Sequence, residues 1–354
     1  MGIQENLPAL KDVFKDDFVI GAAISIDQLT GKEPDSIALV EKHFNTVTPE
    51  NILKWEVVHP EPNVYNFEPA DKLAALAQKN RIQIVGHNLV WHNQTPKWVF
   101  EDKSGNPLGR EALLERMKEH IFTVMGRYKG KIYGWDVVNE AILPDGSYRK
   151  NKWFEIIGQE YLVKAYEYAR QADPDAELYY NDYNMWKKPQ YEGVIKLIKY
   201  LQSNGVRIDG LGIQGHWALD VPPLDEVETA FIALSELGIK LMITELDICV
   251  IPFADHYDNL IDLSSLEPSE QKRLSPYPDA LPDAVQKQLA DRYVEVFSLF
   301  LKYGIKRVTF WAVHDGQSWR SYMPIRGRTD HPMLFDRQCK AKPAFYAVVE
   351  MKLK

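Results

Sequence analysis

Short apolar runs alternate with longer amphipathic segments along the whole chain, and this pair of patterns repeats eight times. Runs that are apolar throughout are typical of parallel strands buried on both faces. In the segments between them, apolar residues such as Leu113, Met117 and Ile121 recur three or four positions apart, which is the spacing of helices that bury one face. The predicted strands are residues 18–24, 43–48, 82–88, 132–138, 177–181, 210–214, 240–245 and 307–312.

A strand followed by a helix, repeated eight times, predicts an α/β fold of the (β/α)8 TIM barrel type. The alternative is an open doubly wound sheet, but no G-x-G-x-x-G motif follows an early strand, and the polar strand ends are spread over many units. A chain of 354 residues could form two domains, yet barrels of this type often have this length and no linker is evident. We therefore expect a single domain over residues 1–354. The longest predicted loop, 250–281, is expected to shape one side of a cleft.

The composition argues against several classes of partner. The net charge of −8 disfavours nucleic acid, because affinity for a polyanion depends on Lys and Arg side chains that neutralise phosphates. No apolar stretch is long enough to span a membrane, and the first 20 residues do not resemble a secretory leader, which predicts a cytoplasmic protein without a membrane partner. The two cysteines, Cys249 and Cys339, are compatible with a reducing compartment. Nine Trp and eighteen Tyr residues suit stacking on sugar rings.

Two of the predicted strands lead into a glutamate. The run 132–138 is followed by Asn139 and Glu140, and the run 240–245 ends on Glu245. Hydrolysis of a glycosidic bond requires two carboxyl groups, one that protonates the leaving oxygen and one that meets the positive charge developing at the anomeric carbon. A purely structural role, in which a glutamate pairs with a nearby cation, explains either residue alone. The presence of both after such apolar runs favours a catalytic pair.

The residues that follow the strands form a chemically coherent set. Parallel strands of a closed barrel all point their carboxyl ends at one face, so these residues are expected to converge there. They are rich in amides, carboxylates, imidazoles and indoles, which predicts a hydrogen-bonding sugar site with aromatic walls. They are Glu50, Asn51 and Lys54; His87, Asn88, Trp91 and His92; Asn139 and Glu140; Asn181, Asp182, Tyr183 and Asn184; Gln214, His216 and Trp217; Glu245 and Asp247; and Trp311, His314, Asp315 and Trp319.

Three histidines of this set raise separate questions. His87 and His92 stand close together in the sequence, but neither an H-x-H nor an H-E-x-x-H motif is present, so we expect no metal and no other cofactor. His216 is predicted to support Glu245. Asp247, two residues past Glu245, is expected to accept a hydrogen bond from the other imidazole nitrogen of His216 and so to fix its tautomer.

Together these residues resemble the motifs of glycoside hydrolase family 10. The resemblance runs from residue 18 to about residue 346, with one motif for each strand in the same order. One departure is visible, because the family usually has Trp-Gly-Val-Thr-Asp at the eighth strand, where this chain has His314 in the fourth position. The motifs are TPENILKW (48–55), GHNLVWH (86–92), WDVVNE (135–140), NDYN (181–184), GIQGH (212–216), ITELDI (243–248) and WAVHDGQSW (311–319).

The resemblance implies a retaining endo-β-1,4-xylanase that acts on xylan or xylo-oligosaccharides, with Glu140 as the acid/base and Glu245 as the nucleophile. Asn139 would touch the 2-hydroxyl of the cleaved residue, and Asn181 and Tyr183 would lie nearer the leaving group. The remaining sugar contacts that it implies are Glu50, Asn51, Lys54, His87, Trp91, Gln214, His216, Trp311 and Trp319.

The chemistry of retention sets its own requirements for this pair. The two carboxyl groups must lie about 5–5.5 Å apart, because the nucleophile reaches the anomeric carbon while the acid reaches the departing oxygen. We expect that spacing for Glu140 and Glu245, with Glu245 ionised and Glu140 protonated at neutral pH. Apolar neighbours and the charge of Glu245 would raise the pKa of Glu140.

Two other functions share parts of this pattern. A cellulase or mannanase barrel would also carry the two strand-end acids, but the group Glu50, Asn51 and Lys54 and the motif of the third strand speak against it. A non-catalytic carbohydrate-binding barrel would be expected to have lost one of the two acids, and both are present. A cytoplasmic enzyme would not meet polymeric xylan, so short imported oligosaccharides are the expected natural substrate.

Overall fold

The strands close into a parallel barrel. The computed structural model describes residues 7–254, 257 and 259–353. Eight strands lie side by side in the order β1, β2, β3, β4, β5, β6, β8 and β10, and β10 pairs with β1 to complete the ring. All of these pairings are parallel, which confirms the predicted (β/α)8 barrel. The strands are β1 (Val19–Ile24), β2 (Thr46–Pro49), β3 (Gln83–Val90), β4 (Gly134–Asn139), β5 (Glu177–Asp182), β6 (Gly210–Ile213), β8 (Lys240–Cys249) and β10 (Arg307–Phe310).

Two predicted strand boundaries were wrong by three residues or more, and the others lie within two residues of the observed ends. The second strand begins at Thr46 rather than at residue 43, because His43 is the last residue of helix α3 (Pro34–His43) and packs against the ring of Phe345. The seventh strand does not end on Glu245. It continues to Cys249 because β7 (His216–Ala218) pairs with this extension.

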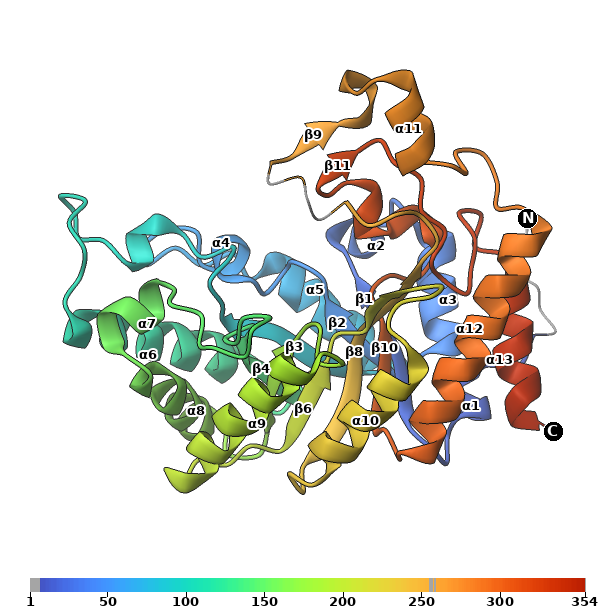
Figure 1. The fold of residues 1–354 in the computed structure, drawn as a ribbon. Helices are drawn as coiled ribbons and strands as arrows, with labels where there is room; N and C mark the ends of the chain where they lie inside the picture. The colour runs from blue at the N-terminus through green and yellow to red at the C-terminus, as the bar shows by residue number, and fades with distance from the viewer. Residues whose placement is uncertain (1–6, 255–256, 258, 354) are drawn as a thin grey trace.

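Helices surround the barrel, as Figure 1 shows. In α6 (Arg110–Arg127), the buried residues include Leu113, Met117 and Ile121, so the predicted helical spacing is confirmed. None of the helices among the described residues is long and apolar enough to cross a bilayer. The others are α1 (Leu10–Val13), α2 (Ile26–Leu29), α4 (Trp55–Val58), α5 (Glu68–Asn80), α7 (Lys152–Ile157), α8 (Glu160–Ala172), α9 (Lys188–Ser203), α10 (Leu224–Ser235), α11 (Pro268–Leu274), α12 (Asp283–Lys302) and α13 (Pro343–Leu353), with short 3-10 turns η1 (Lys97–Val99), η2 (Leu263–Ser265), η3 (Asp315–Gln317) and η4 (Trp319–Ser321).

The strands of the barrel are tightly packed against one another. Trp135 of β4 is fully buried, and a β-carbon at Gly86 of β3 would overlap its indole ring. Only glycine therefore allows this approach between the two strands. Val85, Tyr179 and Met242 form a small apolar cluster of their own, to which β3, β5 and β8 each contribute one side chain.

The described residues of the loop 250–281 form part of a small unit beside the barrel. It contains β9 (Ile261–Asp262), which pairs in parallel with β11 (Ile325–Arg326), and α11 follows it. Figure 1 shows these three elements grouped together apart from the barrel strands. Leu274 and Ile325 are buried in the core of this unit. Among the described residues of the loop, Phe253 lines the large cleft, so the loop shapes the cleft through this side chain.

Candidate active site

A cleft of about 1010 Å³ opens at the carboxyl ends of the strands. Both glutamates and most of the predicted sugar contacts line it, although the loops that carry them come from strands far apart in the sequence. A cleft of this size suits an oligosaccharide rather than a single small metabolite. The predicted residues that line it are Glu50, Asn51, Lys54, His87, Trp91, Asn139, Glu140, Tyr183, Gln214, His216, Glu245, Trp311 and Trp319.

Glu140 lies at a sharp turn directly after β4. Its φ of 55° is in the left-handed region, which costs a residue with a β-carbon roughly 1–2 kcal/mol. Two backbone hydrogen bonds hold the turn: the Glu140 N–H donates to the Asn181 carbonyl at 2.9 Å, and the Glu140 carbonyl accepts from Arg149 Nε at 2.9 Å. The turn thus fixes the side chain of Glu140 at the wall of the cleft.

The Glu140 carboxyl accepts a hydrogen bond at each oxygen. Trp91 Nε1 donates to Oε2 at 2.8 Å, and Gln214 Nε2 donates to Oε1 at 2.9 Å. Burial raises the pKa of Glu140 above its ordinary value, the bonds from Gln214 and Trp91 act in the opposite direction, and the charge of Glu245 raises it further. The net result is a raised pKa, which suits a group that must hold a proton and then release it.

Glu245 is 5% exposed and is held in its ionised form. Asn181 Nδ2 donates to its Oε1 at 2.7 Å, and His216 Nε2 lies 3.1 Å from its Oε2. Burial alone would raise the pKa of Glu245, but the hydrogen bond from His216 and the charges of His87 and His216 outweigh it, and the pKa is lowered. Glu140 and Glu245 are therefore displaced in opposite directions from the same ordinary value, as an acid and a nucleophile require.

His216 connects Glu245 to Asp247. Its Nδ1 lies 2.7 Å from Asp247 Oδ2, and the two acids point to the same face because they are two residues apart on β8. Burial would lower the pKa of His216, but the charge and hydrogen bond of Asp247, together with Glu245, raise it to about 9. We expected a neutral imidazole with a fixed tautomer. A pKa near 9 instead makes His216 an imidazolium at neutral pH, which donates from both nitrogens.

Asn181 was predicted to contact the leaving group, and the structure assigns it a different place. It is fully buried and does not line the cleft. Its Nδ2 donates to Glu245 Oε1, and its Oδ1 accepts from the Thr244 hydroxyl at 2.6 Å. Asn139, beside it, lines the cleft. Asn181 thus contacts the Glu245 carboxylate directly and is covered from the cleft.

Lys54 and its neighbours form the wall near the end of β2. Lys54 Nζ donates to Asn51 Oδ1 at 2.8 Å and lies 5.0 Å from the centre of the Trp91 ring. Burial lowers the pKa of Lys54, although the charges of Glu245 and Glu50 oppose that effect. Burial also raises the pKa of Glu50. This dense polar group, with aromatic rings beside it, can exchange hydrogen bonds with several sugar hydroxyls.

His87, Trp311 and Trp319 also line the cleft. Its Nδ1 lies 2.8 Å from Asp136 Oδ2, and its ring packs edge-on against Trp311 with centroids 5.3 Å apart. Trp319 donates from Nε1 to Asp247 at 2.9 Å, so this indole is fixed by the same acid that holds His216. Aromatic faces held in this way provide flat surfaces for sugar rings.

The family model of glycosyl hydrolase family 10 matches residues 9–351. This chain belongs to that family. The sequence resemblance to family 10 is therefore confirmed. Among the residues that the structure describes, no group of three or more His, Cys, Asp or Glu side chains is arranged to hold a metal ion.

Proteins named as xylanases are similar to this chain over nearly its whole length. Endo-1,4-beta-xylanase A of Xylanibacter ruminicola is 40% identical over 99% of this chain and 95% of that protein. The beta-1,4-xylanase of Dictyoglomus thermophilum is 42% identical over 98% of this chain and 91% of that protein.

Solved structures of the family have the same fold. A GH10 endoxylanase from a sugarcane soil metagenome has a TM-score of 0.92 and 41% identity, covering 98% of this chain and 100% of that one. A mutant of the intracellular xylanase of Thermoanaerobacterium saccharolyticum, solved with xylotriose, has a TM-score of 0.84 and 34% identity, covering 98% of this chain and 100% of that one.

Several residues of this family 10 cleft were not predicted. Trp186 and Lys187 come from the loop after β5, and Lys187 Nζ lies 5.1 Å from the Trp186 ring centre. Arg320 lies between the rings of Trp319 and Phe253, 4.5 Å from each centre. The sequence signal that could have identified Trp186 and Lys187 is their position two and three residues after the NDYN motif. The others are Asn93, Gln94, Val221 and Met323, whereas Asn184 and Trp217 were expected at this face and do line the cleft.

Two strand-end histidines do not line the family 10 cleft. His314, the visible departure from the family pattern, lies with Nε2 3.4 Å from Glu33 Oε2 and accepts from the Gly316 N–H at its Nδ1. It therefore connects the last barrel loop to the segment before α3. His92 is also absent from the cleft lining, and burial lowers its pKa to about 4, with the charge of Arg149 acting in the same direction.

Proposed function

We propose that this protein is a retaining endo-β-1,4-xylanase in which Glu245 is the nucleophile and Glu140 is the acid/base. The observation that carries the proposal is the pair of buried glutamates in one cleft, one with a raised and one with a lowered pKa. The relatives named as xylanases support xylan as the substrate class. We also propose that the whole chain acts as one catalytic domain.

The proposed reaction has two steps. In the first, the Glu245 carboxylate attacks the anomeric carbon and forms a glycosyl ester, while Glu140 gives its proton to the departing sugar oxygen. In the second, the ionised Glu140 takes a proton from a water molecule, whose oxygen attacks the same carbon and releases Glu245. Each step inverts the configuration at the anomeric carbon, so the product keeps the configuration of the substrate.

The charges around the pair suit both steps. In the resting state, the His216 imidazolium and the Asn181 amide hold Glu245 ionised. Once Glu245 is esterified, its negative charge no longer raises the pKa of Glu140, so Glu140 releases its proton more readily. The same residue therefore serves as the acid in the first step and as the base in the second.

We assign Tyr183 and the group around Lys54 to opposite sides of the cleaved bond. Tyr183 lies on the side of the acid, because its hydroxyl accepts from Arg149 Nη2 at 2.8 Å and Arg149 also holds the Glu140 carbonyl. The leaving sugar would stack there. The group around Lys54 would then bind hydroxyls of the sugar that forms the ester, with Trp311 and Trp319 beside it.

We further propose that the enzyme works inside the cell on short oligosaccharides. The similar protein of Thermoanaerobacterium saccharolyticum is described as an intracellular xylanase, and its mutant was solved with xylotriose. Cys249 and Cys339 are both free thiols, which agrees with a reducing compartment.

A comparison of four substrates tests this function. We expect hydrolysis of xylotetraose to exceed that of cellotetraose and mannotetraose by about tenfold or more in kcat/KM, because a misplaced or extra substituent costs about that factor. Release of sugar from insoluble xylan should be slower than cleavage of the tetraose. Glu245→Ala, assayed in parallel, controls for contaminating activity. A preference for cellotetraose or mannotetraose would refute the xylanase assignment, and rapid release from the polymer with little cleavage of the tetraose would refute the oligosaccharide substrate.

A further inference from the structure

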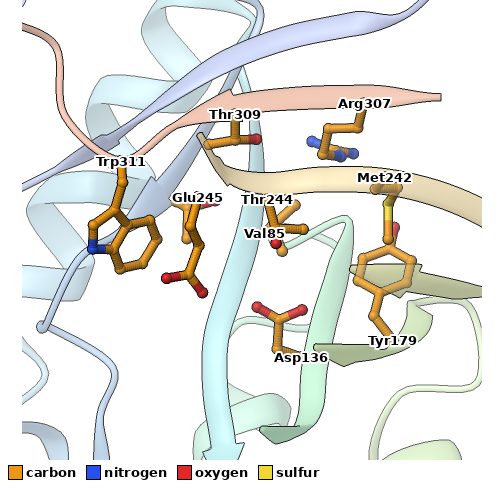
Figure 2. Close-up of a pocket in the computed structure, with 10 residues that line it drawn as sticks. Val85, Asp136, Tyr179, Met242, Thr244, Glu245, Arg307, Thr309 and Trp311 are labelled. Carbon is orange, nitrogen blue, oxygen red and sulfur yellow. The ribbon is translucent and has the colours of Figure 1, made fainter. Parts of the chain in front are cut away.

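A second, much smaller cavity lies inside the barrel beneath the cleft, and Figure 2 shows the side chains around it. Its volume is about 10 Å³, at the lower limit of what one water molecule occupies. Glu245 and Trp311 line both cavities, so they separate the inner one from the cleft. The inner cavity is lined by Thr48, Val85, Asp136, Tyr179, Met242, Thr244, Glu245, Arg307, Thr309 and Trp311.

Three polar atoms of this lining have no hydrogen-bond partner among the described residues. They are Asp136 Oδ1, Thr309 Oγ1 and Arg307 Nε. The three residues are 2%, 1% and 4% exposed, respectively, so bulk water does not reach them. Buried polar groups are almost always hydrogen-bonded, and three unpaired groups around one small cavity indicate that its occupant is polar.

Both terminal nitrogens of Arg307 already have a hydrogen-bond partner. One terminal nitrogen donates to the Thr46 hydroxyl, and the other donates to Gln83 Oε1 at 3.3 Å. Nε is therefore the one nitrogen of Arg307 without a partner among the described residues. Figure 2 shows Arg307 and Thr309 on the same strand, with the Asp136 carboxylate on another strand across the cavity.

Two other polar residues of the lining, Thr244 and Glu245, already have hydrogen-bond partners. The Thr244 hydroxyl donates to Asn181, and both oxygens of Glu245 have partners. Asp136 uses Oδ2 for His87, which leaves Oδ1 as an unpaired acceptor. The cavity thus presents one acceptor, one donor, and a hydroxyl that can act as either.

We propose that this cavity holds one ordered water molecule that bridges Asp136 Oδ1, Thr309 Oγ1 and Arg307 Nε. The water donates to the carboxylate oxygen and accepts from the guanidinium N–H. The Thr309 hydroxyl takes its third hydrogen bond. A water with three polar partners is the ordinary case for buried water, and the volume leaves no room for a second molecule.

The proposed water would act on the nucleophile through Asp136 and His87. Burial raises the pKa of Asp136, and a further donor at Oδ1 favours its ionised form. An ionised Asp136 holds His87, whose charge helps to lower the pKa of Glu245. The charged and titratable groups around Asp136 are His87 of β3, Tyr166 of α8, Tyr179 of β5, Glu245 of β8 and Arg307 of β10.

Diffraction from crystals of three forms tests the water directly: the natural chain, Thr309→Val and Thr309→Ser. Valine keeps the shape of threonine without the hydroxyl, and serine keeps the hydroxyl as a matched control. We expect one ordered density in the cavity of the natural chain and of the serine form, and none at that place in the valine form. An empty cavity in the natural chain, or Arg307 Nε in direct contact with Asp136, would overturn the proposal.

A pH profile tests the effect on the nucleophile. Loss of the water in Thr309→Val raises the pKa of Asp136. The charge on His87 is then held less well, so the pKa of Glu245 rises and the acid limb of kcat/KM moves to higher pH. We expect kcat/KM on an aryl β-xylobioside to fall about threefold on that limb and to stay unchanged on the plateau, while Thr309→Ser follows the natural chain. An unchanged acid limb in a folded valine variant would refute the link to Glu245. This measurement rests on the proposed function. Inactivity on xylosides would refute that function, while diffraction would still decide the water site.

Discussion

Glu245→Ala is expected to lower kcat/KM for xylotetraose by about 10⁴-fold or more, because removal of a nucleophile abolishes the covalent step. Asp247, the other acid in contact with the same histidine, cannot replace it, because Asp247 is fully buried and does not line the cleft. Steady-state kinetics on the tetraose would measure the loss. Far-ultraviolet circular dichroism and a thermal melt control for folding, because Ala leaves the His216 imidazolium with one partner instead of two.

Rescue by a small anion separates a nucleophile from a structural residue. The alanine variant leaves space where the carboxylate was, so azide can attack the anomeric carbon of an activated aryl β-xylobioside. The product should be the α-glycosyl azide, because a single displacement inverts the configuration. A folded alanine variant that keeps most of its activity on xylotetraose, or one whose azide product is the β-anomer, would contradict the role assigned to Glu245.

Glu140→Gln is expected to slow cleavage of xylotetraose by about 10²–10⁴-fold, the usual contribution of a general acid. The loss should depend on the leaving group. In an aryl β-xylobioside with an acidic phenol, the phenolate leaves without a proton. The rate of the first step on such a substrate should therefore change little. Kinetics on a series of phenols of rising pKa would measure this dependence. Equal losses for good and poor leaving groups would show that Glu140 is not the acid.

The pH profile gives the same variant a second signature. Glu140 must be protonated, so activity of the natural chain is lost as the pH rises through its raised pKa. Glu245 must be ionised, so activity is lost as the pH falls through its lowered pKa. Glutamine cannot titrate, and the alkaline limb should therefore be absent in Glu140→Gln, whereas the acid limb remains. Glu140→Asp, which still titrates, is the matched control.

The barrel could be predicted because its evidence is local. Each strand is buried on both faces, so continuous apolar runs and helical spacing suffice to recognise the eight units. The boundaries depend on contacts that are remote in sequence. β8 continues past Glu245 because His216 pairs with Asp247 across 31 positions, and no local pattern records that pairing. His43 was placed in a strand because its apolar neighbours suit either a strand or the end of a helix.

The sequence predicted which residues meet at the site better than it predicted what each of them contacts. Strand ends identify which residues meet, but not which of them are covered by others. Asn139 and Asn181 have the same amide, and the register of β4 against β5 puts them side by side, yet Asn139 lines the cleft and Asn181 lies beneath Glu245. The charge of His216 also depended on two acids at once, which spacing alone does not reveal. Trp186 and Arg320 were missed because loop conformation brings them to the cleft.

The central claim is that Glu140 and Glu245 act in a double displacement, and proton NMR of the first product tests it most directly. The anomeric signals of the sugar released from xylotetraose can be followed from the first minutes, before mutarotation mixes them. A double displacement predicts that the β-anomer appears first and the α-anomer grows in later. Initial release of the α-anomer would mean a single displacement by water, and would contradict the assignment of Glu245 as the nucleophile.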